Sequence, residues 1–185
     1  MTRIIAGTRG GRRIAAPPGR DTRPTSDRVR EALFSALADE LAGARVLDLY
    51  AGSGALGLEA ASRGAGHVLL VESDPRAARA IRANIATLGL AETCQLVEAR
   101  VEQALARGAG AHRYQVVLAD PPYAAGEEEV SRMLAALVDG GWLAPEASIV
   151  IERSSRSPEP AWVEGVTGER GRRYGETALW YGRAS

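Results

Sequence analysis

The sequence contains one cysteine, Cys94, and no lysine. A single thiol can form neither an internal disulfide nor a cysteine-rich zinc site. Aromatic residues make up only 5% of the chain, but 45% is hydrophobic and 25% is charged, and 185 residues can bury a core without disulfides. No apolar stretch approaches the roughly 20 residues of a membrane span, and the amino terminus lacks the apolar region of a signal peptide. We therefore expect a compact, monomeric, cytoplasmic protein with no membrane partner.

The charges cancel, with 23 arginines against 23 acidic residues, but they are unevenly distributed. Residues 1–30 hold eight arginines and two aspartates, a balance of +6, whereas residues 31–168 hold eleven arginines and nineteen acids, a balance of −8. Because arginine supplies every cation, the arginine count itself reflects composition bias, and only its segregation is informative. A basic segment attached to an acidic body favours a polyanionic partner such as an RNA backbone.

The amino-terminal segment predicts a hairpin followed by a helix. Residues 2–16 alternate loosely around glycines, as a short β-hairpin does, and prolines then interrupt regular structure. We expect a basic arm over residues 1–24 that contacts RNA, and a catalytic domain over residues 25–185. Thr25 or Ser26 is a suitable N-cap, and the apolar spacing that follows predicts one long amphipathic helix that ends near Gly43.

The remainder alternates strands with helices. The expected strands are Val46–Tyr50, His67–Glu72, Cys94–Glu98, Tyr114–Asp120 and Ala147–Glu152, and the expected helices are Ala55–Arg63, Pro75–Leu88, Val101–Arg107 and Glu127–Val138. Two further strands, Trp162–Val166 and Thr177–Tyr181, have no helix between them and predict an antiparallel hairpin that closes the sheet. The pattern predicts an α/β fold with a doubly wound, mostly parallel seven-stranded sheet of the Rossmann-like type.

A glycine-rich loop follows the first buried strand. Gly52, Gly54 and Gly57 form a Gly-x-Gly-x-x-Gly pattern, and Glu72 lies eighteen residues beyond Gly54 at the end of the next strand. This arrangement suits any adenosine-containing cofactor, because the glycines allow close approach and the acid can bind ribose hydroxyls. Asp48 favours S-adenosylmethionine, since a carboxylate can face its ammonium group or the loop amides but is unhelpful beside a pyrophosphate. A ligand-free tight turn and an NAD-linked oxidoreductase are the alternatives, although no hydride-site acid or base is evident.

The tetrapeptide Asp120-Pro121-Pro122-Tyr123 stands at the end of the fourth expected strand. The carboxyl ends of parallel strands face the ligand crevice, so this motif is expected beside the glycine loop. A carboxylate and a backbone carbonyl can orient an exocyclic amine of a nucleobase and stabilise the charge that develops as the amine attacks a methyl group. The prolines make the loop rigid, and Tyr123 can stack on a base. A proline turn with an incidental aromatic residue is the structural alternative.

These motifs resemble a known family. The tetrapeptide and Asp48–Gly54 are similar to those of the S-adenosylmethionine-dependent amino-methyltransferases, and the fold implied is theirs. Arg3–Gly7, Arg23–Phe34 and Tyr174–Thr177 resemble the bacterial 16S ribosomal RNA guanine-N2 methyltransferases. The resemblance covers nearly the whole chain and implies transfer of a methyl group to N2 of a guanine in the small ribosomal subunit, with S-adenosylhomocysteine as the product.

The resemblance also implies site residues. The catalytic set is Asp120, Pro121, Pro122 and Tyr123, and the cofactor set is Asp48, Tyr50, Gly52, Gly54, Glu72, Ser73, Arg100 and Val101. Tyr50 stands where the family often has Phe. Arg100 falls about where related enzymes often carry an Asp or Asn that contacts the adenine amine, and because arginine has no acceptor, backbone groups near Arg100 and Val101 are expected to serve instead.

The arm and the following helix supply the candidate phosphate contacts, which are Arg9, Arg12, Arg13, Arg23, Arg28 and Arg30. No metal is expected, because neither His67 nor His112 has a ligand partner at useful spacing. A DNA or RNA adenine-N6 methyltransferase would share the tetrapeptide and is the main alternative. A non-catalytic ribosome-assembly protein that binds RNA would share the basic arm.

Overall fold

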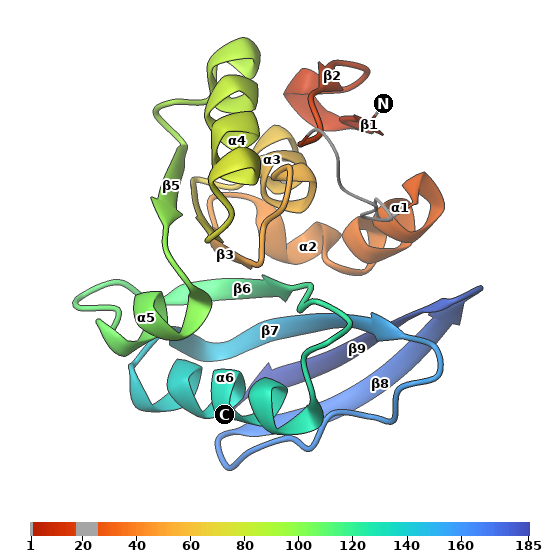
Figure 1. Cartoon of the computed structure of the whole chain (residues 1–185), viewed down its shortest axis with the longest axis vertical. Coiled ribbons are helices and arrows are strands. Elements are labelled where there is room, and N and C mark those ends of the chain that lie inside the picture. The colour runs from red at the N-terminus through yellow and green to blue at the C-terminus, as the bar shows by residue number, and fades with distance from the viewer. Residues whose placement is uncertain (1, 18–25) are drawn as a thin grey trace.

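A computed structural model of the chain describes residues 2–17 and 26–185. Its main sheet has seven strands in the order β5-β4-β3-β6-β7-β9-β8 (Figure 1). The strands are β3 (Arg45–Leu49), β4 (His67–Glu72), β5 (Cys94–Glu98), β6 (Tyr114–Ala119), β7 (Leu143–Ser154), β8 (Val166–Tyr174) and β9 (Thr177–Ala184). The first five in the spatial order are parallel, and β9 is antiparallel to both of its neighbours, β7 and β8. The predicted doubly wound, mostly parallel sheet is confirmed.

Helices cover both faces of this sheet. They are α1 (Asp27–Ala36), α2 (Ala38–Leu41), α3 (Ala55–Ser62), α4 (Pro75–Leu88), α5 (Val101–Ala106) and α6 (Glu127–Asp139). Leu33 of α1, Leu58 of α3 and Ile81 of α4 are buried in the apolar cluster on one face. Leu105 of α5 and Leu134 of α6 belong to the cluster on the other face. The last four helices agree with the expected ranges to within one residue at each end.

The expected single helix after the arm is divided in two. Leu37 separates α1 from α2 and has φ −98° and ψ 3°, outside the regular helical region. Leu37 and Leu41 are both 1% exposed. Apolar residues therefore stay buried through the bend. Helical spacing alone did not predict the bend.

The closing hairpin is longer than expected. Its first strand is Val166–Tyr174 and not Trp162–Val166, so the glycine- and arginine-rich segment predicted as a turn is itself a strand. Its second strand extends to Ala184, beyond the expected Tyr181. The indole of Trp162 lies against Gly168 and Gly182, and that of Trp180 against Gly171, at positions where a Cβ would collide with the ring. These glycines are strand residues that leave room for tryptophan packing.

The described part of the arm packs on the helical layer. Its short strands β1 (Thr2–Arg3) and β2 (Arg13–Ile14) pair antiparallel, with the 3₁₀ helix η1 (Gly7–Arg9) between them. The expected hairpin is therefore present. Ile4 and Ile14 are buried in the same cluster as the helices on that face. The expected boundary between residues 24 and 25 lies outside the described residues, as does the candidate N-cap Thr25. Within the described ranges, no helix is long and apolar enough to cross a membrane.

Candidate active site

The glycine loop connects β3 to α3 at the carboxyl edge of the sheet. Gly52 and Gly54 have φ values of +61° and +85°, and Gly54 is the N-cap of α3. Such left-handed conformations favour glycine. A Cβ at Gly52 would meet nothing within 4 Å, so the space beside this turn is open. The loop has the backbone shape and the free space of a cofactor cradle.

Glu72 fixes the loop from the neighbouring strand. Its Oε1 accepts a 2.7 Å hydrogen bond from the backbone N–H of Gly52, and its Oε2 accepts one of 2.8 Å from Asp74. The side chain is 7% exposed. Each carboxylate oxygen has a second lone pair, so these bonds orient Glu72 and leave acceptor capacity for a ribose hydroxyl.

Asp48 lies inside β3, directly below the loop. Its Oδ2 accepts a 2.8 Å hydrogen bond from the backbone N–H of Gly57 in α3. The residue is 2% exposed, and burial raises the pKa of its carboxyl group to about 7, with the Gly57 bond opposing the shift and nearby Glu72 adding to it. The sequence analysis predicted either a cofactor ammonium group or a backbone amide of the glycine motif as the partner of Asp48, and the structure contains the amide, that of Gly57. A cationic ligand nearby would favour the ionised form.

The remaining predicted cofactor residues lie just after the carboxyl ends of β3, β4 and β5. Tyr50 comes after β3, has φ +60°, and burial raises the pKa of its hydroxyl to about 12. Ser73 is exposed after β4. The Arg100 side chain is 69% exposed and pairs with Glu102 at 2.6 Å, whereas Val101 is buried in the core. The Arg100 guanidinium therefore points to solvent, and only the backbone at this position is placed to line a cofactor site.

The Asp120 loop lies beside the glycine loop. Asp120 directly follows β6, and its backbone N–H donates a 3.4 Å hydrogen bond to the carbonyl of Leu49, the last residue of β3. The two predicted motifs therefore meet at one edge of the sheet. Tyr123 is 71% exposed at the far end of the tetrapeptide. Within the described residues the carbonyl of Pro121 accepts no hydrogen bond, which leaves an acceptor free next to Asp120.

Two residues of this site were missed by the sequence analysis. Arg153 of β7 donates to the carbonyls of Ala125 at 2.7 Å and Pro122 at 3.5 Å, and so holds the loop in shape. Glu152 lies next to Asp120 on the adjacent strand, because Ile151 of β7 pairs with Ala119 of β6. Glu152 is the last residue of the expected strand Ala147–Glu152 and Arg153 follows it directly, so their position at the carboxyl edge was the available signal.

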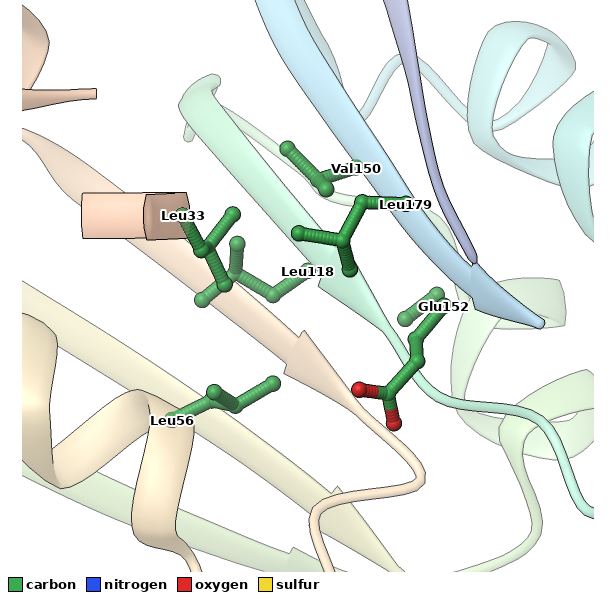
Figure 2. A pocket seen from close by; sticks show the side chains of 7 residues that line it. Leu33, Leu56, Leu118, Val150, Glu152 and Leu179 are labelled. Carbon is green, nitrogen blue, oxygen red and sulfur yellow. The ribbon is translucent and has the colours of Figure 1, made fainter. Parts of the chain in front are cut away.

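Glu152 and Asp120 form a pair of neighbouring carboxyl groups. Burial, together with the charge and the hydrogen bond of Glu152, raises the pKa of Asp120 well above its ordinary value. Glu152 also lines a small apolar pocket whose other walls include Leu33, Leu118 and Leu179. Figure 2 shows the Glu152 carboxylate beyond these leucines, directed toward the end of β3. The pair thus faces the region between the two motif loops.

The predicted phosphate contacts differ in accessibility. Arg13 and Arg28 are exposed. Arg9 Nε donates to the carbonyl of Leu88 at 2.6 Å, and the exposed Arg12 donates to Thr87 at 2.8 Å, so both side chains satisfy carbonyls at the end of α4. Arg23 lies outside the described residues.

The prediction for Arg30 is wrong. Its side chain is fully buried, with Nη2 at 2.7 Å from both the Arg3 carbonyl and Asp27 Oδ1. Its Nη1 lies 3.4 Å from Glu59, whose side chain is also fully buried and accepts the backbone N–H groups of Ile5 and Ala6. Arg30 therefore joins α1 to α3 and the arm and is not available to a phosphate.

Asn84 of α4 connects the arm to the glycine loop. Its side-chain amide exchanges two hydrogen bonds with the backbone of Ala15 and donates a third, of 3.0 Å, to the carbonyl of Ser53. The residue is 3% exposed. The position of β2 and the conformation of the loop are thus coupled through one side chain. In the described part of the chain, no group of three or more His, Cys, Asp or Glu residues is arranged to hold a metal ion.

The fold and the site define a protein of the S-adenosylmethionine-dependent methyltransferase class. The chain belongs to the family described as Conserved hypothetical protein 95, whose model matches residues 2–183. The resemblance to small-subunit ribosomal RNA methyltransferases is confirmed at the family level by a relative in Escherichia coli strain K12. That protein, Ribosomal RNA small subunit methyltransferase D, is 43% identical over 150 residues, which cover 81% of this chain and 73% of the relative.

Solved structures agree with this assignment. The Escherichia coli protein titled "Putative methyltransferase yhhF" superposes with a TM-score of 0.86 at 34% identity, over 99% of this chain and 97% of the other. An RNA methyltransferase from Salinibacter ruber, solved in complex with S-adenosyl-L-homocysteine, has a TM-score of 0.65 at 17% identity, over 88% of this chain and 94% of the other. At that identity the second likeness shows the fold alone.

Proposed function

We propose that the protein transfers a methyl group from S-adenosylmethionine to the exocyclic N2 amine of a guanine in 16S ribosomal RNA. The observation that carries this proposal is the junction of the Asp120 loop with the glycine loop through the Asp120–Leu49 hydrogen bond. This junction supports a tetrapeptide that binds the amine next to a loop that binds the cofactor. The name of the Escherichia coli relative supports ribosomal RNA of the small subunit as the substrate.

The residues present fit the proposed cofactor. The open space beside Gly52 gives room for a ligand against the backbone, and Glu72 retains acceptor capacity for the ribose. Asp48 would face the methionine portion, where its carboxylate stabilises the cationic groups. When bound, S-adenosylmethionine supplies the electrophilic methyl group.

In the proposed mechanism the protein aligns the amine and stabilises its developing charge. Asp120 and the free carbonyl of Pro121 accept the two N–H bonds of the guanine N2, which directs the nitrogen lone pair at the methyl carbon. Tyr123, which is 71% exposed, stacks on the base. With S-adenosylmethionine bound, the amine would take the methyl group, the sulfur would keep the electron pair of the S–C bond, and one N2 proton would pass to Asp120. Arg153 contributes by holding the loop carbonyls in place.

RNA phosphates would contact basic side chains on both sides of this edge. The exposed Arg12, Arg13 and Arg28 extend from the arm and α1. On the other side, the tip of the β8–β9 hairpin is joined to the end of β7 by a 2.8 Å hydrogen bond from Ser155 to Glu176. The hairpin carries exposed Arg172 and Arg173. Neither forms an ion pair within the described residues.

The test compares the wild-type protein with Asp120→Asn on small ribosomal subunits that lack base methylation, using methyl-labelled S-adenosylmethionine. We expect the variant to lose at least about a hundredfold in kcat, because an amide accepts less well and cannot take the proton. Cofactor affinity, measured by calorimetry, should stay within about twofold. Near-normal turnover by the variant would contradict the mechanism, whereas lost cofactor binding would assign Asp120 to the cofactor site.

A further inference from the structure

Glu152 stands beside Asp120 on the adjacent strand. Strands β6 and β7 are parallel with Ala119 opposite Ile151, so the next residues along the two strands, Asp120 and Glu152, are neighbours. Burial, followed by the charge of neighbouring Glu152 and its side-chain hydrogen bonding, raises the pKa of the Asp120 carboxyl group well above its ordinary value. Glu152 is only partly exposed, and Figure 2 shows its carboxylate directed away from the leucines that line the apolar pocket. The site therefore offers two adjacent carboxyl groups to whatever binds Asp120.

An arrangement with a purely structural role would not need two acids. An amide at either position would keep a hydrogen bond between the strands without placing two like charges next to each other beside leucine side chains. Two ionised carboxylates present only acceptors. Their complement is a ligand edge with N–H donors on adjacent atoms.

Among the nucleobases that carry an exocyclic amine, guanine has such an edge. Its N1–H lies next to its N2 amine, so neighbouring atoms both donate. In adenine the atom next to the N6 amine is the unprotonated N1, and in cytosine the atom next to the N4 amine is the unprotonated N3. Both of these nitrogens are acceptors and would face a carboxylate lone pair to lone pair.

We propose that Glu152 is the specificity-determining residue for guanine, its carboxylate accepting the N1–H of the target base while Asp120 accepts from the N2 amine. This inference rests on the proposed function. It explains how a tetrapeptide that can bind the exocyclic amines of several bases is restricted to the amine of guanine. The proton that the raised pKa favours on Asp120 passes to solvent when the base binds, so that each carboxylate can accept one donor. A base with an acceptor at the N1 position would place that lone pair against the Glu152 carboxylate, and this repulsion disfavours binding of that base.

The experiment uses small ribosomal subunits reconstituted with 16S RNA that carries either guanine or 2-aminopurine at the position the wild-type protein methylates. 2-Aminopurine retains the amine but has an acceptor at N1. We expect the wild-type protein to favour guanine by about 10- to 100-fold in kcat/KM, the range for one lost hydrogen bond to a charged group. In Glu152→Gln the side-chain amide can donate to that acceptor. The ratio of kcat/KM for guanine to that for 2-aminopurine should therefore fall by at least about tenfold.

Two controls separate specificity from folding. Glu128→Gln makes the same change on α6, where Glu128 is 94% exposed, and should leave the preference unchanged. Cofactor affinity of Glu152→Gln should match the wild type, which shows that the cofactor site is intact. An unchanged preference in Glu152→Gln would overturn the role of Glu152 while leaving guanine methylation in place. Wild-type methylation of adenine, or of no base, would overturn both this inference and the proposed function.

Discussion

At the residue scale, the charge of Arg30 and its position in the helix predict different roles. Its charge favoured a phosphate contact, yet it shares the apolar face of α1 with Leu33 and Phe34, three and four residues further on. That spacing can be seen in the sequence. The sequence does not show that Glu59 is the buried acid that pairs with Arg30, because only the fold brings α3 against α1 and the arm.

The consequence for stability is testable with two neighbouring arginines. Arg30→Ala removes one of the two cations beside the Glu59 carboxylate and leaves Arg63 at 2.8 Å, so the loss should be clear but below the roughly 3–5 kcal/mol of a buried charge left with no partner. Arg28→Ala, at an exposed position of the same helix, should change the free energy of unfolding by less than about 0.5 kcal/mol. Urea denaturation followed by circular dichroism measures both, and equal losses in the two variants would refute a structural role for Arg30.

Asp48 predicts a pH dependence of cofactor affinity. Its pKa is raised to about 7 in the free chain, and a cationic cofactor favours the ionised carboxylate, so binding releases a proton below that pH. Affinity for S-adenosylmethionine should therefore rise from pH 5.5 toward about 7 and level off above, by up to tenfold per unit at the acidic end. Calorimetry across this range measures the slope. The slope should disappear in Asp48→Asn, and its persistence there would assign the proton to another group.

At the element scale, the β8–β9 hairpin is where the sequence prediction was least accurate. Glycine and arginine between residues 168 and 173 have the composition of a turn, and the strand forms because Trp162 and Trp180 cover the glycines. The tryptophans lie six to twenty residues from the glycines that they cover and contact them only once the hairpin is folded, so the propensity of the segment itself could not reveal the strand. The βα units, by contrast, are set by local periodicity and capping signals such as Pro75 at the start of α4, and their ranges were predicted closely.

The hairpin also provides a test of the proposed RNA-binding surface. Arg172→Glu should raise KM for the ribosomal subunit about five- to tenfold with little change in kcat, because phosphate contacts position the substrate without taking part in the reaction. Arg107→Glu is the matched control, since Arg107 is also exposed but follows α5 at the opposite edge of the sheet. Methylation kinetics at two salt concentrations measure the effect, and identical behaviour of the two variants would exclude the hairpin tip from the surface.

At the scale of the whole molecule, the candidate site lies where the ends of β3, β4, β6 and β7 meet. The sequence predicted Asp48, Gly52, Glu72 and Asp120 at one edge because the carboxyl ends of parallel strands converge. It could not predict the partners that orient them, such as Glu152, since strand order and register decide those contacts. The arm and α1 lie on one side of this edge and the hairpin on the other (Figure 1), so the basic side chains proposed to hold RNA flank the reacting groups.

The identity of the methylated nucleoside tests this account most directly. Small ribosomal subunits without base methylation, protein-free 16S RNA and DNA would each be incubated with the protein and labelled S-adenosylmethionine, then digested to nucleosides and separated. The account predicts label in N2-methylguanosine from the ribosomal substrates and none from DNA. Label in N6-methyladenine, in RNA or in DNA, would contradict it, because the paired carboxyl groups of Asp120 and Glu152 would then face a base with an acceptor beside its amine.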